Sequence, residues 1–148
     1  MCGIVGYIGP RQCKGLLFDG LKRLEYRGYD SAGIALIADG SIHVAKSEGK
    51  LKELESHLNR LPSSSTVGMG HTRWATHGPP TTDNAHPHVS GHIALIQNGS
   101  IDNYQDIKEE LVADGVVFKS QTDTEVVLHL MNKITVKTPD FGKALVEL

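Results

Sequence analysis

The second residue of this chain is a cysteine, and its place beside the initiator methionine gives it a chemistry that internal cysteines lack. Because a small residue after Met1 normally permits removal of the methionine, Cys2 is expected to carry a free α-amino group. Such an amine titrates at roughly 7.7–8.0 and can serve as a general base near neutral pH. A thiol and a base then share one residue, as in the pairing of a nucleophilic threonine with its own terminal amine. Cys2 alone does not decide the function, because most cysteines beside a start codon have no catalytic role.

Three later segments carry polar groups, and each has an ordinary structural explanation when taken alone. Asn98-Gly99 is a dipeptide that is common in turns. The segment RWATHG at 73–78 precedes two prolines, which is typical of an exposed loop. Asp123 falls in the first turn of a predicted helix, where the helix dipole favours an acidic residue whatever the function. None of these segments indicates an activity by itself.

The apolar residues alternate between strand and helix periods along the chain, which predicts an α+β fold. Strands are expected at 4–8, 33–38, 41–46, 67–71 and 93–97. Asp39-Gly40 favours the positive φ angles of a tight hairpin turn, so the two strands around it are predicted to pair antiparallel.

Helices are expected where leucines recur at helical spacing, at 16–24 and 51–58, and again from 103 to about 114. Thr122 and Glu125 have the spacing of a capping box, so another helix is predicted to begin there. Thr138-Pro139 is typical of a helix start, yet apolar residues continue to the last position. The sequence is therefore expected to stop inside an element.

Composition excludes several classes of function. A chain of 148 residues with 39% hydrophobic and 22% charged residues is expected to form a single globular domain. Its net charge of -2 offers no positive field for nucleic acid or an anionic membrane surface, so neither is an expected partner. Two cysteines close in sequence do not form a secreted disulfide framework, and no signal peptide is apparent. A cytoplasmic protein is predicted.

The polar segments occur in one order together with the opening MCGIVG: RLEYRGYDSAG, HTRWATHG, NAHPH, QNG and TDTE. Together they resemble the glutaminase domain of the class II glutamine amidotransferases, which are N-terminal-nucleophile enzymes. The resemblance covers essentially the whole chain. LEYRGYDSAG and HTRWATHG further resemble the branch of that family that converts fructose 6-phosphate to glucosamine 6-phosphate.

The resemblance implies three catalytic groups. Cys2 would attack the side-chain amide of L-glutamine and pass through a thioester, releasing ammonia. The side chain of Asn98 and the backbone N–H of Gly99 would form the oxyanion hole. In a longer parent, the ammonia would pass to fructose 6-phosphate.

The resemblance also implies a set of substrate-binding residues. Arg73, Thr76 and His77 would lie near the α-carboxylate of glutamine, and Trp74 near the exit of the closed site. Asp123 would bind the α-ammonium group. The planar fork of an arginine suits a carboxylate better than the mobile charge of a lysine. For Arg27, electrostatic support of the site and a structural bridge between two early segments remain open as alternatives.

The fold implied by the family is an αββα four-layer sandwich of the N-terminal-nucleophile hydrolase type. Domains of this family continue with further strands, so residues 1–148 are expected to be the N-terminal part of a glutaminase domain, C-terminally incomplete. The sugar isomerase domains that bind fructose 6-phosphate are expected to be absent. The parent is expected to be a homo-oligomer, and the resemblance implies no cofactor and no metal.

Two rival functions compete with this one. The histidines gather in one stretch that could serve a metal hydrolase: His71, His77, His86, His88 and His92. Their spacing matches no zinc finger and no cysteine lies among them, so the metal site is the weaker interpretation. The second rival is a non-catalytic glutamine-binding or assembly module, which predicts binding without turnover.

Overall fold

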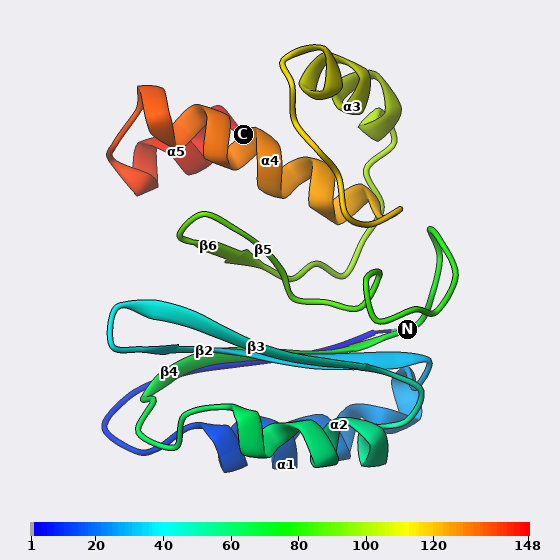
Figure 1. The fold of residues 1–148 in the computed structure, drawn as a ribbon, viewed down its shortest axis with the longest axis vertical. Coiled ribbons are helices and arrows are strands. Elements are labelled where there is room, and N and C mark those ends of the chain that lie inside the picture. Colours follow the sequence, from blue (N-terminus) through cyan, green and yellow to red (C-terminus); the bar gives the residue numbers. More distant parts are fainter. Residues whose placement is uncertain (1) are drawn as a thin grey trace.

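The first half of the chain forms a four-stranded antiparallel sheet (Figure 1) in a computed structural model that describes residues 2–148. The strands lie in the order β1-β4-β2-β3, and each neighbouring pair is antiparallel. They are β1 Gly3–Ile8, β2 Ser31–Ala38, β3 Ser41–Glu48 and β4 Val67–Arg73. Met1, and with it the prediction of its removal, lies outside the described residues.

Two helices cover one face of this sheet (Figure 1). Helix α1, Lys14–Leu24, packs on β1 and β4, and helix α2, Leu51–His57, packs on β3 and β2. The core between them is built from leucines at helical spacing and alternate residues of β2. Its members with no exposed surface include Leu17, Leu21, Leu54, Ile34 and Leu36. Full burial of one such side chain stabilises the fold by roughly 1.5–3 kcal/mol.

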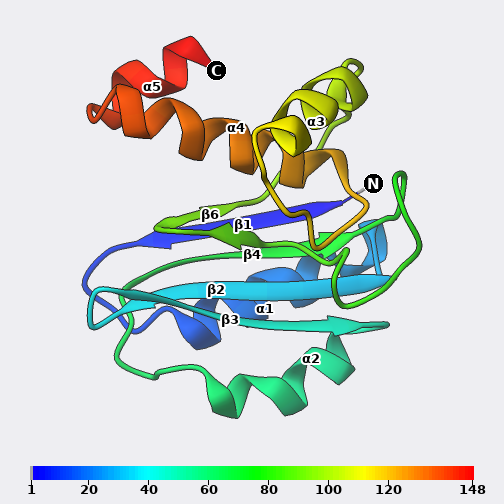
Figure 2. The same cartoon turned by 45° about the horizontal axis from the view of Figure 1, so that its top comes forward.

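The second half of the chain lies on the opposite face of the sheet (Figure 2). A short hairpin of β5 His88–Ser90 and β6 Ile93–Leu95 comes first, and helix α4, Asp123–Lys137, packs on both of its strands. Helices α3, Tyr104–Ala113, and α5, Phe141–Glu147, pack against α4. A Cβ atom at Gly33 of β2 would lie 2.3 Å from the carbonyl oxygen of His86, so a glycine there lets the second half approach the sheet.

The α+β prediction is confirmed, and so are the local signals behind it. Ala38 pairs with Ser41 around Asp39-Gly40, and both turn residues have positive φ angles, 51° and 72°. Thr122 is the N-cap of α4, and its Oγ1 accepts a hydrogen bond from the Glu125 N–H. None of the helices formed by residues 2–148 has the length and apolar character needed to span a bilayer.

Two local predictions were wrong in extent, and one strand was not predicted at all. The strand expected at 93–97 ends at Leu95, so Asn98-Gly99 is not at a strand end but in the irregular segment that leads to α3. Strand β5 was missed because three residues are too few to show alternation. The last helix begins at Phe141 rather than at Thr138-Pro139, since Asp140 supplies the N-cap by accepting from the Lys143 N–H.

Candidate active site

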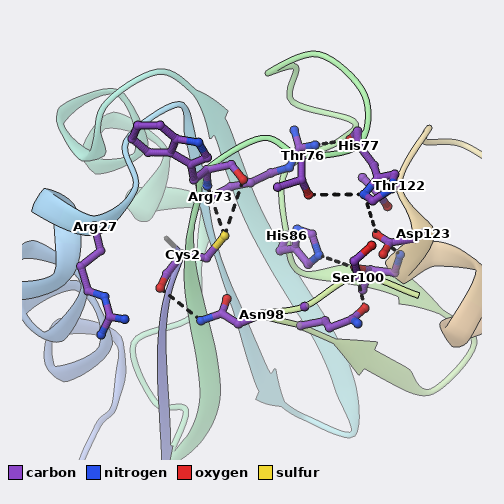
Figure 3. A pocket seen from close by; sticks show the side chains of 14 residues that line it. Cys2, Arg27, Arg73, Thr76, His77, His86, Asn98, Ser100, Thr122 and Asp123 are labelled. Carbon is purple, nitrogen blue, oxygen red and sulfur yellow. Dashed lines mark hydrogen bonds and ion pairs between the residues drawn. The ribbon is translucent and has the colours of Figure 1, made fainter. Parts of the chain in front are cut away.

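One cavity of about 580 Å³ is lined by every residue that the family resemblance assigned to the glutaminase site (Figure 3). It lies where the ends of β1 and β4 meet the segments before α3 and α4. The residues singled out in advance are Cys2, Arg27, Arg73, Trp74, Thr76, His77, Asn98, Gly99 and Asp123. Five further lining residues had not been assigned to the glutaminase site: His86, Gln97, Ser100, Thr122 and Thr124. Each of these belongs to NAHPH, QNG or TDTE, or directly follows QNG, so the motifs already marked their neighbourhood.

Cys2 is placed by the antiparallel pairing of β1 with β4. Gly3 pairs with Thr72, which brings the residue before β1 next to the end of β4. The backbone N–H of Trp74 donates to Cys2 Sγ at 3.2 Å, and the thiol lies 3.7 Å from the Trp74 carbonyl oxygen. The backbone of Trp74 thus holds the sulfur at the end of β4. Both Cys2 and the buried Cys13 are free thiols.

Asn98 reaches Cys2 from the other half of the molecule. Its Nδ2 donates to the backbone carbonyl oxygen of Cys2 at 3.1 Å, although the two residues are 96 positions apart. Asn98 and Gly99 are both exposed to the cavity. Cys2, the Asn98 amide and Gly99 therefore line the same cavity, an arrangement that is compatible with an oxyanion hole next to the nucleophile.

Arg73 is almost fully buried, with 3% of its surface exposed, and it organises the loop that follows β4. Its Nη1 donates to the Pro79 carbonyl oxygen at 3.1 Å, and its Nη2 donates to the carbonyl oxygens of His77 and Gly78. Burial lowers the pKa of Arg73, and the nearby Asp30 carboxylate opposes that shift. These three contacts do not use all five N–H donors of the guanidinium, and the side chain also lines the cavity.

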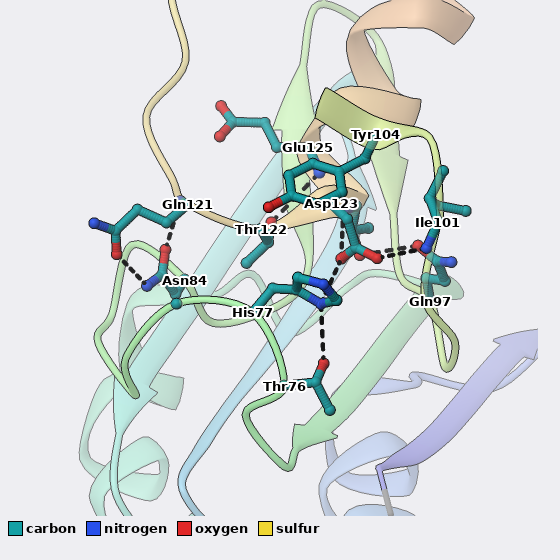
Figure 4. A network of polar contacts seen from close by, with 12 residues as sticks. Thr76, His77, Asn84, Gln97, Ile101, Tyr104, Gln121, Thr122, Asp123 and Glu125 are labelled. Atoms are coloured by element: carbon teal, nitrogen blue, oxygen red, sulfur yellow. Dashed lines mark hydrogen bonds and ion pairs between the residues drawn. The ribbon is translucent and has the colours of Figure 1, made fainter. Parts of the chain in front are cut away.

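Asp123 lies across the cavity from Cys2, at the first turn of α4 (Figure 3). Its Oδ2 accepts from the Ile101 N–H at 2.9 Å, which ties the segment after Gly99 to the start of α4. Its Oδ1 lies 3.9 Å from His77 Nδ1, and that same nitrogen lies 3.3 Å from Thr76 Oγ1 (Figure 4). The cavity thus carries an arginine and a carboxylate near one another, the complement of a zwitterion.

The remaining residues singled out lie at the Cys2 end of the cavity. Arg27 closes the 3-10 turn Glu25–Arg27 that follows α1. The Trp74 side chain is half exposed and meets the ring of Tyr29 edge-on, with centroids 5.8 Å apart. This places an aromatic pair at the rim of the cavity, where the sequence had predicted Trp74 alone.

Asp30 is a positioning residue that sequence reasoning missed. Its Oδ2 accepts from the Ala75 N–H, and its backbone N–H donates to the Arg73 carbonyl oxygen at 3.2 Å. These contacts hold the turn that presents the Trp74 N–H to the sulfur. Asp30 belongs to the motif RLEYRGYDSAG, so its segment had been noticed but its partner had not.

Three buried histidines lie in a row, here called the histidine stack: His71 and His86 are face to face, His86 and His88 meet edge-on, and His86 also lines the cavity. The ring centroids of His71 and His86 are 4.4 Å apart, and those of His86 and His88 are 4.7 Å apart. The Nε2 atoms of His86 and His88 contact Thr124 Oγ1 and Thr122 Oγ1. Among residues 2–148, no group of three or more His, Cys, Asp or Glu could hold a metal ion, so the geometry of the stack does not support the metal hydrolase.

Burial of this stack predicts an acid-sensitive fold. Burial lowers the pKa of His71 to about 4 and that of His88 to about 3, and it lowers the pKa of His86 as well. In the unfolded chain these rings titrate near 6.5, so below that pH unfolding takes up protons. The contribution of the three histidines to the free energy of unfolding is therefore fully present above pH 6.5. Below that pH the free energy of unfolding falls by about 1.4 kcal/mol per pH unit per histidine, down to about pH 4.

Urea unfolding at pH 7, 6 and 5 measures this slope. His88→Gln is expected to flatten it, whereas the same change at the exposed His92 is expected to leave it unaltered. A free energy of unfolding at pH 5 equal to that at pH 7 would show that the stack does not control acid stability.

Comparison with protein families and with curated relatives gives one consistent match. Residues 44–140 match the family described as a glutamine amidotransferase domain. The chain is 57% identical over 133 residues to the glutamine–fructose-6-phosphate aminotransferase (isomerizing) of Symbiobacterium thermophilum, covering 88% of this chain and 22% of the relative. It is 52% identical over 146 residues to that of Pyrococcus horikoshii, covering 97% and 24%. The chain thus spans less than a quarter of these relatives.

Two solved structures share the fold over the whole chain. One is the glutamine phosphoribosylpyrophosphate amidotransferase from B. subtilis, with a TM-score of 0.78 and 26% identity. The other is described as the allosteric regulatory enzyme of purine biosynthesis, with a TM-score of 0.80 and 28% identity. Each match covers 100% of this chain and 33% of the solved one.

Proposed function

Because this chain belongs to the class II glutamine amidotransferases, we propose that it hydrolyses L-glutamine to glutamate and ammonia through a thioester on Cys2. One observation carries the proposal: Cys2 Sγ and the Asn98 amide, from opposite halves of the chain, meet in one cavity. A nucleophile beside an oxyanion donor is the minimum that acyl transfer requires.

The reaction begins when the α-amine of the trimmed Cys2 accepts the thiol proton. The sulfur then attacks the amide carbon of glutamine, and the oxygen that becomes negative is stabilised by the Asn98 Nδ2 and the Gly99 N–H. Collapse of this intermediate transfers the proton to the nitrogen and releases ammonia. Water hydrolyses the thioester, returning the thiol and releasing glutamate.

The opposite end of the cavity recognises the amino-acid part of the substrate. Asp123 pairs with the α-ammonium group, while Arg73, Thr76 and His77 receive the α-carboxylate. The buried guanidinium supports this assignment, since it lies in the cavity with N–H donors still available. The Trp74–Tyr29 pair closes the rim after glutamine has entered, and Arg27 adds positive charge at the Cys2 end.

Arg73→Lys is expected to raise KM for glutamine by roughly 10- to 100-fold, since a charge-assisted hydrogen bond contributes about 1.5–3 kcal/mol. A lysine has one nitrogen in place of the two that contact the carbonyl oxygens of His77, Gly78 and Pro79, so the thermal midpoint is also expected to fall. Steady-state kinetics and thermal unfolding measure both effects, with the exposed Arg60→Lys as the matched control. An unchanged KM would remove Arg73 from substrate binding.

In a longer parent the ammonia passes to fructose 6-phosphate, which is bound by sugar isomerase domains beyond these 148 residues. The names of the two relatives and their greater length support this part. Residues 1–148 are then the N-terminal part of the glutaminase domain of a cytoplasmic homo-oligomer. Its fold is the four-layer αββα sandwich, with the β5–β6 hairpin as the beginning of the second sheet.

The direct test is incubation of the purified protein with L-glutamine, with glutamate and ammonia measured separately. Equal amounts of the two products are expected. If glutamine binds by calorimetry but neither product forms, the chain is a glutamine-binding module, the rival function that the sequence left open.

A further inference from the structure

The His71 side chain contacts the Asn98 side chain through a single ring nitrogen, Nε2. His71 belongs to β4, two positions before Arg73, and none of its surface is exposed. Its Nε2 lies 3.0 Å from Asn98 Oδ1 and 3.1 Å from the backbone carbonyl oxygen of Gln97. The other ring nitrogen, Nδ1, is buried and has no hydrogen-bond partner among residues 2–148.

Three contacts link the Gln97 carbonyl oxygen, His71, Asn98 and the Cys2 carbonyl oxygen. The two carbonyl oxygens determine which atom is the donor in each contact. The Gln97 carbonyl oxygen can only accept, so His71 Nε2 must carry the proton. Asn98 must then turn its oxygen toward His71, because two donors would otherwise face each other. At the far end, the Cys2 carbonyl oxygen can also only accept, which requires the Asn98 nitrogen on that side. All three contacts are thus satisfied when His71 Nε2 is protonated, Asn98 Oδ1 faces His71, and Asn98 Nδ2 faces the Cys2 carbonyl oxygen.

We propose that His71 is a positioning residue that fixes the rotation of the Asn98 amide, so that its Nδ2 rather than its oxygen faces the reacting centre. The inference rests on the proposed function, since the oxyanion at that centre is what the Asn98 nitrogen would stabilise. One Nδ2–H is held by the Cys2 carbonyl oxygen, which leaves the second for an oxyanion in the cavity that Asn98 lines.

Burial keeps His71 in the form that this role requires. Protonation would place an N–H at the buried, unpartnered Nδ1, and the ring of His86 stacks against this one. Burial accordingly lowers the pKa of His71 to about 4, so the ring is neutral at neutral pH. A neutral ring with its proton on Nε2 is a fixed donor, not an acid or base in the reaction.

A pair of substitutions separates positioning from simple packing. His71→Met removes the donor at similar length and is expected to lower kcat by roughly 10- to 100-fold, with KM for glutamine changed less than about threefold. His71→Gln offers an N–H near the place of Nε2 and is expected to restore most of kcat. Combined with Asn98→Ala, His71→Met is expected to add little, because nothing is left to position.

Three outcomes would overturn the inference: a kcat for His71→Met close to that of the unaltered protein, equal kcat values for the Met and Gln variants, or full additivity with Asn98→Ala. A readout that needs no variant is the histidine ¹⁵N spectrum of the unaltered protein at pH 7, which is expected to show His71 protonated on Nε2. Protonation on Nδ1 would also overturn it. If the unaltered protein releases no glutamate, the proposed function fails, and the ¹⁵N spectrum still decides the rotation of Asn98.

Discussion

Cys2→Ala is expected to lower the rate of ammonia release from glutamine by on the order of 10⁴-fold or more. Loss of a nucleophile leaves only the binding groups and the oxyanion donors, which cannot form the thioester. The substitution removes the sulfur that the Trp74 N–H contacts but leaves the donors of Asn98 and Gly99 in place. Glutamine is therefore expected to bind to the variant with little loss of affinity, as calorimetry would measure.

Cys13→Ala is the matched control for this experiment. Cys13 is the only other cysteine of the chain, and it is buried beside Ser65 at the start of α1. Its loss is expected to lower stability and to leave most of the glutaminase rate. If Cys13→Ala were inactive while folded and Cys2→Ala were active, the nucleophile would have been assigned to the wrong thiol.

Asn98→Ala is expected to lower kcat by about 10²- to 10³-fold, which is the usual cost of removing one oxyanion donor. KM is expected to change little, because the groups assigned to the substrate's α-ammonium and α-carboxylate lie elsewhere in the cavity. The fold is expected to survive, since Asn98 is exposed and lies outside every helix and strand.

The neighbouring Asn103→Ala serves as control, because Asn103 precedes α3 without a side-chain capping bond. Stopped assays over a range of glutamine concentrations separate kcat from KM for both variants. A kcat for Asn98→Ala within a fewfold of the unaltered protein would mean that the oxyanion is stabilised by other donors.

Features that depend on nearby residues were predictable from the sequence. Asp39-Gly40 set the hairpin because the positive φ angles belong to the two turn residues themselves. Thr122 and Glu125 marked the start of α4 because a cap involves residues only three positions apart. The motifs were also enough to choose nine residues that the structure brings to one cavity, although their roles stay predictions.

Features that depend on contacts between distant segments were not predictable in this way. Asp30 was missed because the N–H that it binds belongs to Ala75. His71 had been grouped with the other histidines of its stretch, since nothing in the sequence places it against Asn98. The three carbonyl partners of Arg73 depend on how the loop at 77–79 folds back, which its composition does not reveal.

The central claim is that the amine of Cys2 activates its own sulfur, and a blocked amino terminus tests it most directly. The rate of glutamate release is measured for two forms whose termini are verified by intact mass: one that begins at Cys2 and one that carries an extra residue before it. A general base typically raises the rate by about 10²- to 10⁴-fold, so the extended form is expected to release glutamate at least about 10²-fold more slowly. Equal rates for the two forms would contradict the account.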